Sequence, residues 1–179
     1  MTMPATRIAL LLEDGYEDSE AIVPYYRLQE PGWKVDLVAP EAGQTYRGKN
    51  GTTLKSTHAA RGVRAADYDA VVVPAGHAPD RMRRFPEMVA LVREANAQGK
   101  TIAAICHAAQ LLIEADIVRG RTLTCFSSVK TDVKNAGGTF VDREVVVDSN
   151  LVTSRVPADL PAFMSELVKV IGARVGAPA

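Results

Sequence analysis

A cysteine followed by a histidine stands at the end of a fully apolar run. Thr101–Ile105 has the short, continuous hydrophobic pattern of a buried strand, and Cys106 and His107 follow it directly, before helical spacing resumes. A thiol on a sharp strand-to-helix turn has the geometry of a nucleophile elbow. The partial charge and free N–H groups of a helix N-terminus favour thiolate over thiol. We therefore expect Cys106 to be a nucleophile with a lowered pKa, and His107 to be a general base or a hydrogen-bond donor beside it.

Two further polar segments follow other predicted strands. Residues 13–20 are rich in carboxylates, and Gly76 lies in a turn after a second apolar run. Ligands of open parallel sheets bind beyond the C-terminal strand ends, so these segments should converge on Cys106. Glu17 and Glu20 share a helix face, and one of them can enter the cleft and bond the thiol. The alternative is that both only interact with the helix dipole. The Gly76 N–H is a candidate oxyanion donor.

The other cysteine and the other histidines are expected to have no catalytic part. Cys125 lies within the apolar run 123–126, which favours a packing role. His58 and His77 are expected to be ordinary surface or hydrogen-bonded histidines. Two widely spaced cysteines fit neither a disulfide framework nor a zinc pattern. We therefore expect no metal and no cofactor.

The elements that position these residues alternate as they do in a parallel sheet with helices on both faces. Short apolar runs predict strands at 8–12, 34–39, 70–74, 101–105, 123–126, 144–147 and 151–153. Helical spacing predicts helices at 21–29, 86–98, 108–115, 129–136 and 161–171. Two short segments at 45–47 and 53–56 predict a hairpin appendage. No linker or repeat interrupts the pattern, so we expect a single domain over residues 1–179.

Charge and hydropathy exclude several classes of function. The 21 basic and 21 acidic residues give no general attraction to nucleic acid or to anionic lipid. The basic trio Arg81, Arg83 and Arg84 is expected to be the solvated face of a short helix. The first apolar run is too short for a signal segment or a membrane span. We expect a cytoplasmic protein that binds neither nucleic acid nor membranes.

Several separated motifs resemble the ThiJ/PfpI superfamily. They are AICHAAQ at 104–110, YEDSE at 16–20 with PYYRL at 24–28, and the segment 145–159. The chain is most similar to the PfpI-type intracellular proteases, and the similarity extends over residues 7–171. It implies a single class I glutamine amidotransferase-like domain, an α/β sandwich of three layers with a flavodoxin-like, mostly parallel sheet, and a nucleophile elbow. It also implies a homo-oligomer, a dimer that can build a hexamer.

The resemblance also implies roles for particular residues. Cys106 matches the nucleophile, His107 the histidine that follows it, and Glu20 the buried glutamate that bonds the sulfur. Asp80 stands where PfpI-type proteases carry a glutamate from a neighbouring subunit, and its side chain is one methylene shorter. Gly76 matches the second glycine of the oxyanion turn, so the N–H groups of Gly76 and His107 are the expected oxyanion donors.

Family membership leaves the activity open, because members are described as peptidases, glyoxalases, deglycases, chaperones and stress sensors. Phe126 stands where the glyoxalase branch has a histidine, so the general base of that branch is missing. We expect a stress-response hydrolase in which Cys106 adds to the carbonyl of a small adduct or a peptide and Glu17 lines the substrate site. The alternative is a non-catalytic redox sensor or chaperone that uses oxidation of Cys106.

Overall fold

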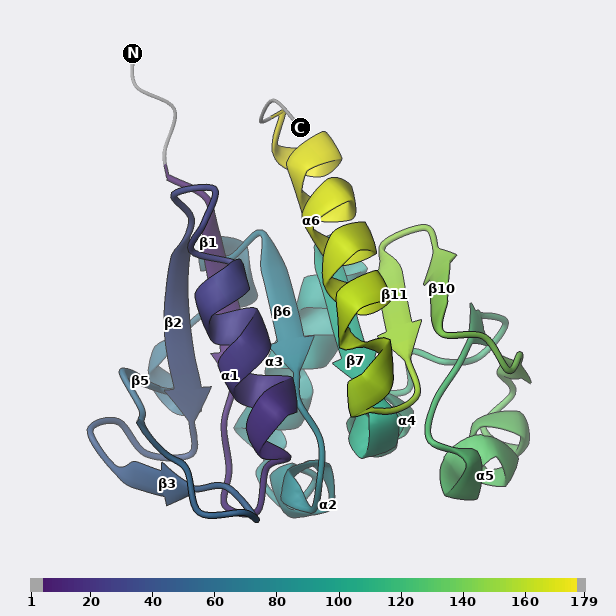
Figure 1. Cartoon of the computed structure of the whole chain (residues 1–179), viewed down its shortest axis with the longest axis horizontal. Coiled ribbons are helices and arrows are strands. Elements are labelled where there is room, and N and C mark those ends of the chain that lie inside the picture. The colour runs from purple at the N-terminus through teal and green to yellow at the C-terminus, as the bar shows by residue number, and fades with distance from the viewer. Residues whose placement is uncertain (1–4, 177–179) are drawn as a thin grey trace.

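The computed structural model describes residues 5–176 and has a seven-stranded sheet at its centre (Figure 1). In their spatial order, its strands are β10 (Val145–Asp148), β11 (Leu151–Ser154), β7 (Thr101–Ile105), β6 (Ala70–Val73), β1 (Arg7–Leu11), β2 (Lys34–Ala39) and β5 (His58–Ala59). The β10–β11 pair is antiparallel, and the other neighbouring pairs of this sheet are parallel. The predicted mostly parallel sheet is confirmed.

Helices cover both faces of the sheet. On one face α1 (Asp18–Arg27) packs beside α6 (Leu160–Val175), and α3 (Pro86–Ala97) and α4 (Ala109–Glu114) lie on the other (Figure 1). Two short helices, α2 (Ala78–Met82) and α5 (Lys130–Asn135), lie near the edge where the parallel strands end. The predicted three-layer sandwich is therefore confirmed. Within residues 5–176, no helix has both the length and the apolar character that crossing a membrane requires.

The central strands read as continuous apolar runs because helices cover both of their faces. Every residue of β6 and of β7 is buried. The register pairs Val73 with Ala104, and Ile105 with Ser154. The turns that follow β6, β7 and β11 therefore leave the sheet side by side. This is the edge at which open parallel sheets bind ligands.

A small hairpin lies beside the same edge of the sheet (Figure 1). Its strands are β3 (Thr45–Arg47) and β4 (Thr53–Lys55), which pair antiparallel and apart from the main sheet. The appendage predicted from the glycine-bounded turn between these segments is confirmed. The hairpin contributes one residue to the site described below.

The strand predicted at 123–126 is wrong as a member of the main sheet. The strand found there, β8 (Thr122–Leu123), pairs with β9 (Thr139–Phe140) in a separate two-stranded sheet. Beyond it the backbone bonds elsewhere: the Thr124 N–H donates to Thr153 Oγ1 at 3.0 Å, and the Phe126 N–H donates to the Cys106 carbonyl at 3.0 Å. Cys125 is buried in this segment without being part of a strand.

Candidate active site

Cys106 stands on a strained turn directly after β7. Its φ is +62°, in the left-handed region that costs a non-glycine residue about 1–2 kcal/mol. Cys106–Ala108 forms one 3₁₀ turn, and α4 follows it. Strain of this kind persists where the surrounding structure fixes the backbone, and it clusters at functional sites. The predicted nucleophile elbow is confirmed in its geometry.

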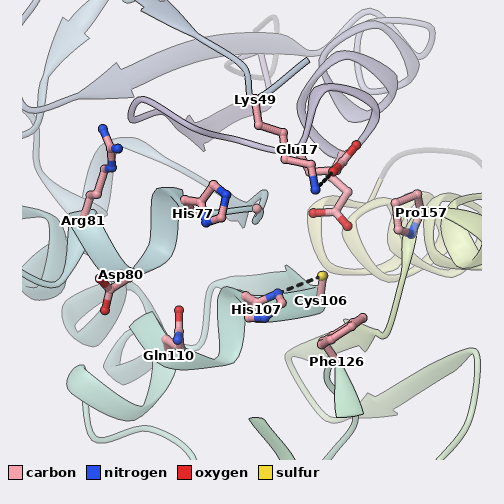
Figure 2. A pocket seen from close by; sticks show the side chains of 12 residues that line it. Glu17, Lys49, His77, Asp80, Arg81, Cys106, His107, Gln110, Phe126 and Pro157 are labelled. Atoms are coloured by element: carbon pink, nitrogen blue, oxygen red, sulfur yellow. Dashed lines mark hydrogen bonds and ion pairs between the residues drawn. The ribbon is translucent and has the colours of Figure 1, made fainter. Parts of the chain in front are cut away.

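The His107 ring is held on three sides. Its Nδ1 lies 3.3 Å from Cys106 Sγ, and its Nε2 lies 3.3 Å from Ser128 Oγ (Figure 2 shows the first contact). The ring stacks on Phe126 with centroids 4.7 Å apart. Burial lowers the pKa of His107, so the neutral imidazole predominates at neutral pH. A neutral ring beside the thiol can accept its proton.

The contact between neighbouring side chains depends on the elbow. Residues i and i+1 diverge on a regular helix, so Cys106 and His107 would point apart there. The positive φ of Cys106 turns its side chain out of that pattern. Ser128 was not predicted to be part of the site, because it lies 21 residues after His107 and reaches it only through the tertiary fold.

Glu20 is fully buried beneath the site. Its Oε2 accepts a hydrogen bond from the Ala75 N–H at 3.0 Å, whereas its Oε1 has no partner within residues 5–176. Burial and the neighbouring charge of Glu17 together raise the pKa of Glu20 to about 7, against the opposing effect of the Ala75 N–H. The carboxyl and the Cys106 thiol perturb each other's pKa, although no contact between them meets the distance and angle limits of a hydrogen bond. Glu20 is therefore poised to hold a proton near the sulfur at neutral pH.

The expectation of a lowered pKa for Cys106 is wrong while Glu20 is ionised. Burial, together with the negative charge of Glu20, raises the pKa of the thiol to about 12. The His107 N–H and Lys49 oppose it. Helix α4 has only six residues and begins after the 3₁₀ turn, so little macrodipole acts on the sulfur. A thiolate is favoured only in the arrangement that leaves the proton on Glu20.

The substitution Glu20→Gln tests how the ionisation of the buried Glu20 carboxyl affects the stability of the fold. The pKa of Glu20 is about 7 in the folded protein and near 4.5 when exposed, so its contribution to stability is full below pH 4.5 and is lost as pH rises through 7. The loss amounts to roughly 3 kcal/mol. We expect Glu20→Gln to raise the Tm more at pH 8 than at pH 5, measured by calorimetry. Glu30→Gln, at an exposed position, serves as the control. Parallel pH–stability curves for the Glu20 variant and wild type would contradict this result.

Gly76 forms the turn that follows β6 and faces the elbow. Its φ is +69°, and a Cβ there would lie 2.5 Å from the Gly15 carbonyl oxygen and 2.6 Å from the Glu17 nitrogen. The turn is tied to that loop by hydrogen bonds from the His77 N–H to the Gly15 carbonyl and from the Glu17 N–H to the Ala75 carbonyl. The Gly76 N–H itself donates to no protein group in the described part of the chain, residues 5–176. It is available to an oxyanion.

Replacing Gly76 by alanine should lower stability through two separate effects. A left-handed non-glycine residue costs about 1–2 kcal/mol, and the backbone contacts of the new Cβ add to that cost. Gly99→Ala is the matched control, because Gly99 has a φ of +70° and nothing lies within 4 Å of its Cβ position. In chemical denaturation we expect Gly76→Ala to lose at least about 1 kcal/mol more than Gly99→Ala. Equal losses would mean that the turn can move away from the loop.

Lys49, from the hairpin, reaches the site and was not predicted. Its Nζ lies 2.7 Å from Glu17 Oε2 (Figure 2). The hairpin tip is fixed because the Asp18 carboxylate accepts the N–H groups of Asn50 at 2.8 Å and Thr52 at 2.9 Å. The acidic start of α1 and the glycine-bounded turn of the hairpin are both visible in the sequence, and such segments can form hydrogen bonds with each other. Their spacing along the chain does not show that they meet, so Lys49 could not be assigned to the site from the sequence.

These residues surround one cavity of about 650 Å³. It is lined by Glu17, Glu20, Lys49, Gly76, His77, Asp80, Arg81, Cys106, His107, Gln110, Phe126 and Pro157. All six predicted site residues are thus brought together, and His77 joins them at the cavity. Within residues 5–176, no group of three or more His, Cys, Asp or Glu side chains could hold a metal ion.

Asp80 lines the cavity but does not contact His107. Its side chain is 72% exposed, and its carboxylate lies 4.0 Å from Arg83 Nη1. Figure 2 shows Asp80 well apart from His107 and Cys106. The side chain that contacts His107 Nε2 is that of Ser128. Within one chain, Asp80 therefore does not complete a triad with Cys106 and His107.

Comparisons with known proteins find relatives over nearly the whole chain. The chain is 43% identical over 169 residues to "Protein/nucleic acid deglycase 2" of Escherichia coli, which covers 93% of this chain and 98% of that protein. It is 43% identical over 165 residues to "Deglycase PH1704" of Pyrococcus horikoshii, covering 92% of this chain and 99% of that one.

A solved structure shows the same fold. It is a two-domain protein of Anabaena variabilis with DJ-1/ThiJ/PfpI-like and ferritin-like domains, and it superposes with a TM-score of 0.92 at 39% identity. The match covers 97% of this chain and 50% of that one. The sequence profile of the DJ-1/PfpI family matches residues 6–170. The chain therefore belongs to the DJ-1/PfpI family.

Proposed function

We propose that the protein is a cysteine-dependent hydrolase of carbonyl adducts, a deglycase, with a role in protection against stress. The observation that carries the proposal is the contact of Cys106 with His107 at a strained elbow, beside the buried carboxyl of Glu20. Relatives that are 43% identical over nearly their whole length are named deglycases. The site geometry and the names of these relatives both support hydrolytic chemistry.

In the proposed reaction, the proton of the Cys106 thiol passes to His107, with Glu20 protonated beside the sulfur, and the sulfur attacks the adduct carbon that carries the amine or thiol. A C–S bond to Cys106 forms as the bond from that carbon to the amine or thiol breaks, and the electron pair of the broken bond leaves with the amine or thiol. His107 gives its proton to this leaving group. The backbone N–H groups of Gly76 and His107 hold the oxygen of the neighbouring carbonyl.

Water completes the proposed cycle. His107 takes a proton from the water as the water oxygen attacks the carbon bound to Cys106. The C–S bond breaks with its electron pair on the sulfur, which takes the proton back from His107. The net change is the addition of one water across the bond between the carbonyl-derived carbon and the amine or thiol. Phe126 supports this sequence only by stacking on His107, because it has no proton to exchange.

The proposal is tested by turnover of a panel of substrates by wild type and Cys106→Ser. The panel contains methylglyoxal itself, methylglyoxal adducts of amino acids and thiols, and fluorogenic peptides. A cysteine-dependent rate on the adducts supports the proposal, whereas a rate on the peptides alone would make the protein a peptidase. Peroxide oxidation of Cys106 without turnover of any substrate would favour the redox sensor.

We propose that Asp80 contributes to catalysis only in an oligomer, at the active site of a neighbouring copy. The carboxylate is exposed and makes no contact with His107 of its own chain, so a neighbouring copy is the partner it can serve. Asp80→Asn should then lower turnover only at protein concentrations at which light scattering shows a dimer or larger assembly. A loss that is independent of assembly would assign Asp80 to its own chain.

A further inference from the structure

A second hollow opens beside the catalytic cavity. It has a volume of about 520 Å³ and is lined by Asp14, Gly15, Arg47, Gly48, Lys49 and Arg81. Lys49 and Arg81 line both hollows, so the two lie side by side. Figure 2 shows Arg81 on the side of the catalytic cavity opposite Phe126 and Pro157. A substrate whose carbonyl lies at Cys106 can therefore extend toward these cations.

This second hollow, a groove on the surface, has an excess of positive charge. Three cations, Arg47, Lys49 and Arg81, line it against one carboxylate, Asp14. Asp14 already accepts the backbone N–H of Arg47 at 2.8 Å, and Lys49 pairs with Glu17 at 2.7 Å. We call Arg47, Lys49 and Arg81 the basic groove.

Two guanidinium groups of the basic groove have no acidic partner in the part of the chain that the structure describes. Within residues 5–176, neither Arg47 nor Arg81 forms an ion pair or a side-chain hydrogen bond. Arg83, two residues after Arg81, lies 3.2 Å from Glu114 instead. Glu13 is near enough to be affected by Arg81, but it is buried and does not line the groove. Arg81 is exposed, as expected for a solvated helix face, and it also lines the groove.

We infer that the basic groove binds an anionic group of the substrate. A guanidinium presents paired N–H donors that match a carboxylate or a phosphate. The preferred adducts are then those formed on amines or thiols that carry such a group, with the carbonyl at Cys106 and the anion at Arg81 and Arg47. This inference rests on the proposed function, but its first test does not need turnover.

The first test compares two alkylating reagents that differ only in charge. Maleimidopropionate and maleimidopropionamide both add to a thiol, and mass spectrometry measures the rate of each at Cys106. We expect Arg81→Gln to lower the acid-to-amide rate ratio about threefold, the size of an exposed charge interaction, and Arg47→Gln/Arg81→Gln to lower it further. Arg84→Gln, a nearby exposed arginine that lines neither hollow, should leave the ratio unchanged.

Salt provides an independent check in the same assay. The wild-type ratio should fall as ionic strength rises, because exposed charges are screened over about 10 Å at 0.1 M salt. An unchanged ratio in the double variant, or the same decrease in Arg84→Gln, would overturn the inference. Because the reagents report only on approach to Cys106, this result is independent of whether the protein is a deglycase.

The second test uses turnover and distinguishes the two kinds of anion. One pair of substrates is the methylglyoxal adducts of N-acetylcysteine and of its amide, and the other is the adducts of guanosine monophosphate and of guanosine. The charged member of a pair should have the lower KM in wild type, and Arg81→Gln should remove that advantage with little change in kcat. The pair with the larger effect identifies carboxylate or phosphate. If no adduct in either pair is turned over, the proposed function fails while the reagent ratio still decides the inference.

Discussion

Replacing Cys106 by serine is expected to lower kcat/KM for adduct hydrolysis by about 10⁴-fold or more, the order seen when a covalent nucleophile is removed. A serine hydroxyl holds its proton far more tightly than a thiol, and burial together with Glu20 opposes its ionisation. Steady-state kinetics on the preferred adduct measures the effect. The fold should persist, since the substitution changes one atom of a side chain.

Cys125→Ala is the matched control for that experiment. Cys125 is the other free cysteine and is buried in the segment after β8, outside the catalytic cavity. Its loss should leave kcat/KM within about threefold of wild type, even if the Tm falls. A Cys106→Ser variant that kept a tenth of wild-type activity would show that the reaction does not use a covalent bond to Cys106.

Replacing His107 by alanine is expected to reduce turnover by about 10²–10⁴-fold, the usual contribution of a general acid–base group. The ring lies 3.3 Å from Sγ and is the group placed to move protons to and from the substrate. Oxidation of Cys106 by peroxide needs only an accessible thiolate, so its rate should change much less. Parallel measurements of turnover and of oxidation by mass spectrometry separate the two effects.

Ser128→Ala provides a graded comparison with His107→Ala. Ser128 contacts only the distal nitrogen of the ring, so its loss should lower kcat by less than the loss of His107 and should shift the pH profile of kcat. Intact turnover with slowed oxidation in His107→Ala would contradict the catalytic role. The histidine would then only tune the thiolate.

Local sequence patterns predicted most of the framework of the site. The bounds predicted for β2 and β7 match the observed ones. In β7 every position is buried between two helical layers, so nearly every residue is hydrophobic. The elbow at Cys106 followed from the abrupt end of one of these runs. Glu20 was one of two acidic candidates on a helix face, and the structure places its side chain, fully buried, at the cavity.

The remaining features depend on contacts between segments that are distant in sequence. Lys49 reaches the cavity because Asp18 fixes the hairpin tip, and Ser128 reaches His107 from a later turn. The direction of the Cys106 pKa shift was predicted wrongly because burial and the charge of Glu20 outweigh a short helix. The run at 123–126 satisfies the hydrophobic pattern of a strand, yet its hydrogen bonds go to the elbow and to a threonine side chain.

The activation of Cys106 is measured most simply by the rate at which iodoacetamide, a neutral reagent, labels Cys106 and Cys125 as a function of pH. The pKa of Glu20 is about 7, and the proton lost there leaves one negative charge that the carboxyl and the sulfur share. We predict that labelling of Cys106 rises with a midpoint near pH 7 and then levels off, and that Glu20→Gln lacks this step. Cys125, whose pKa burial raises to about 11, should label slowly throughout. If Cys106 labels no faster than Cys125, and only at high pH in wild type and in Glu20→Gln, then Cys106 is not an activated nucleophile.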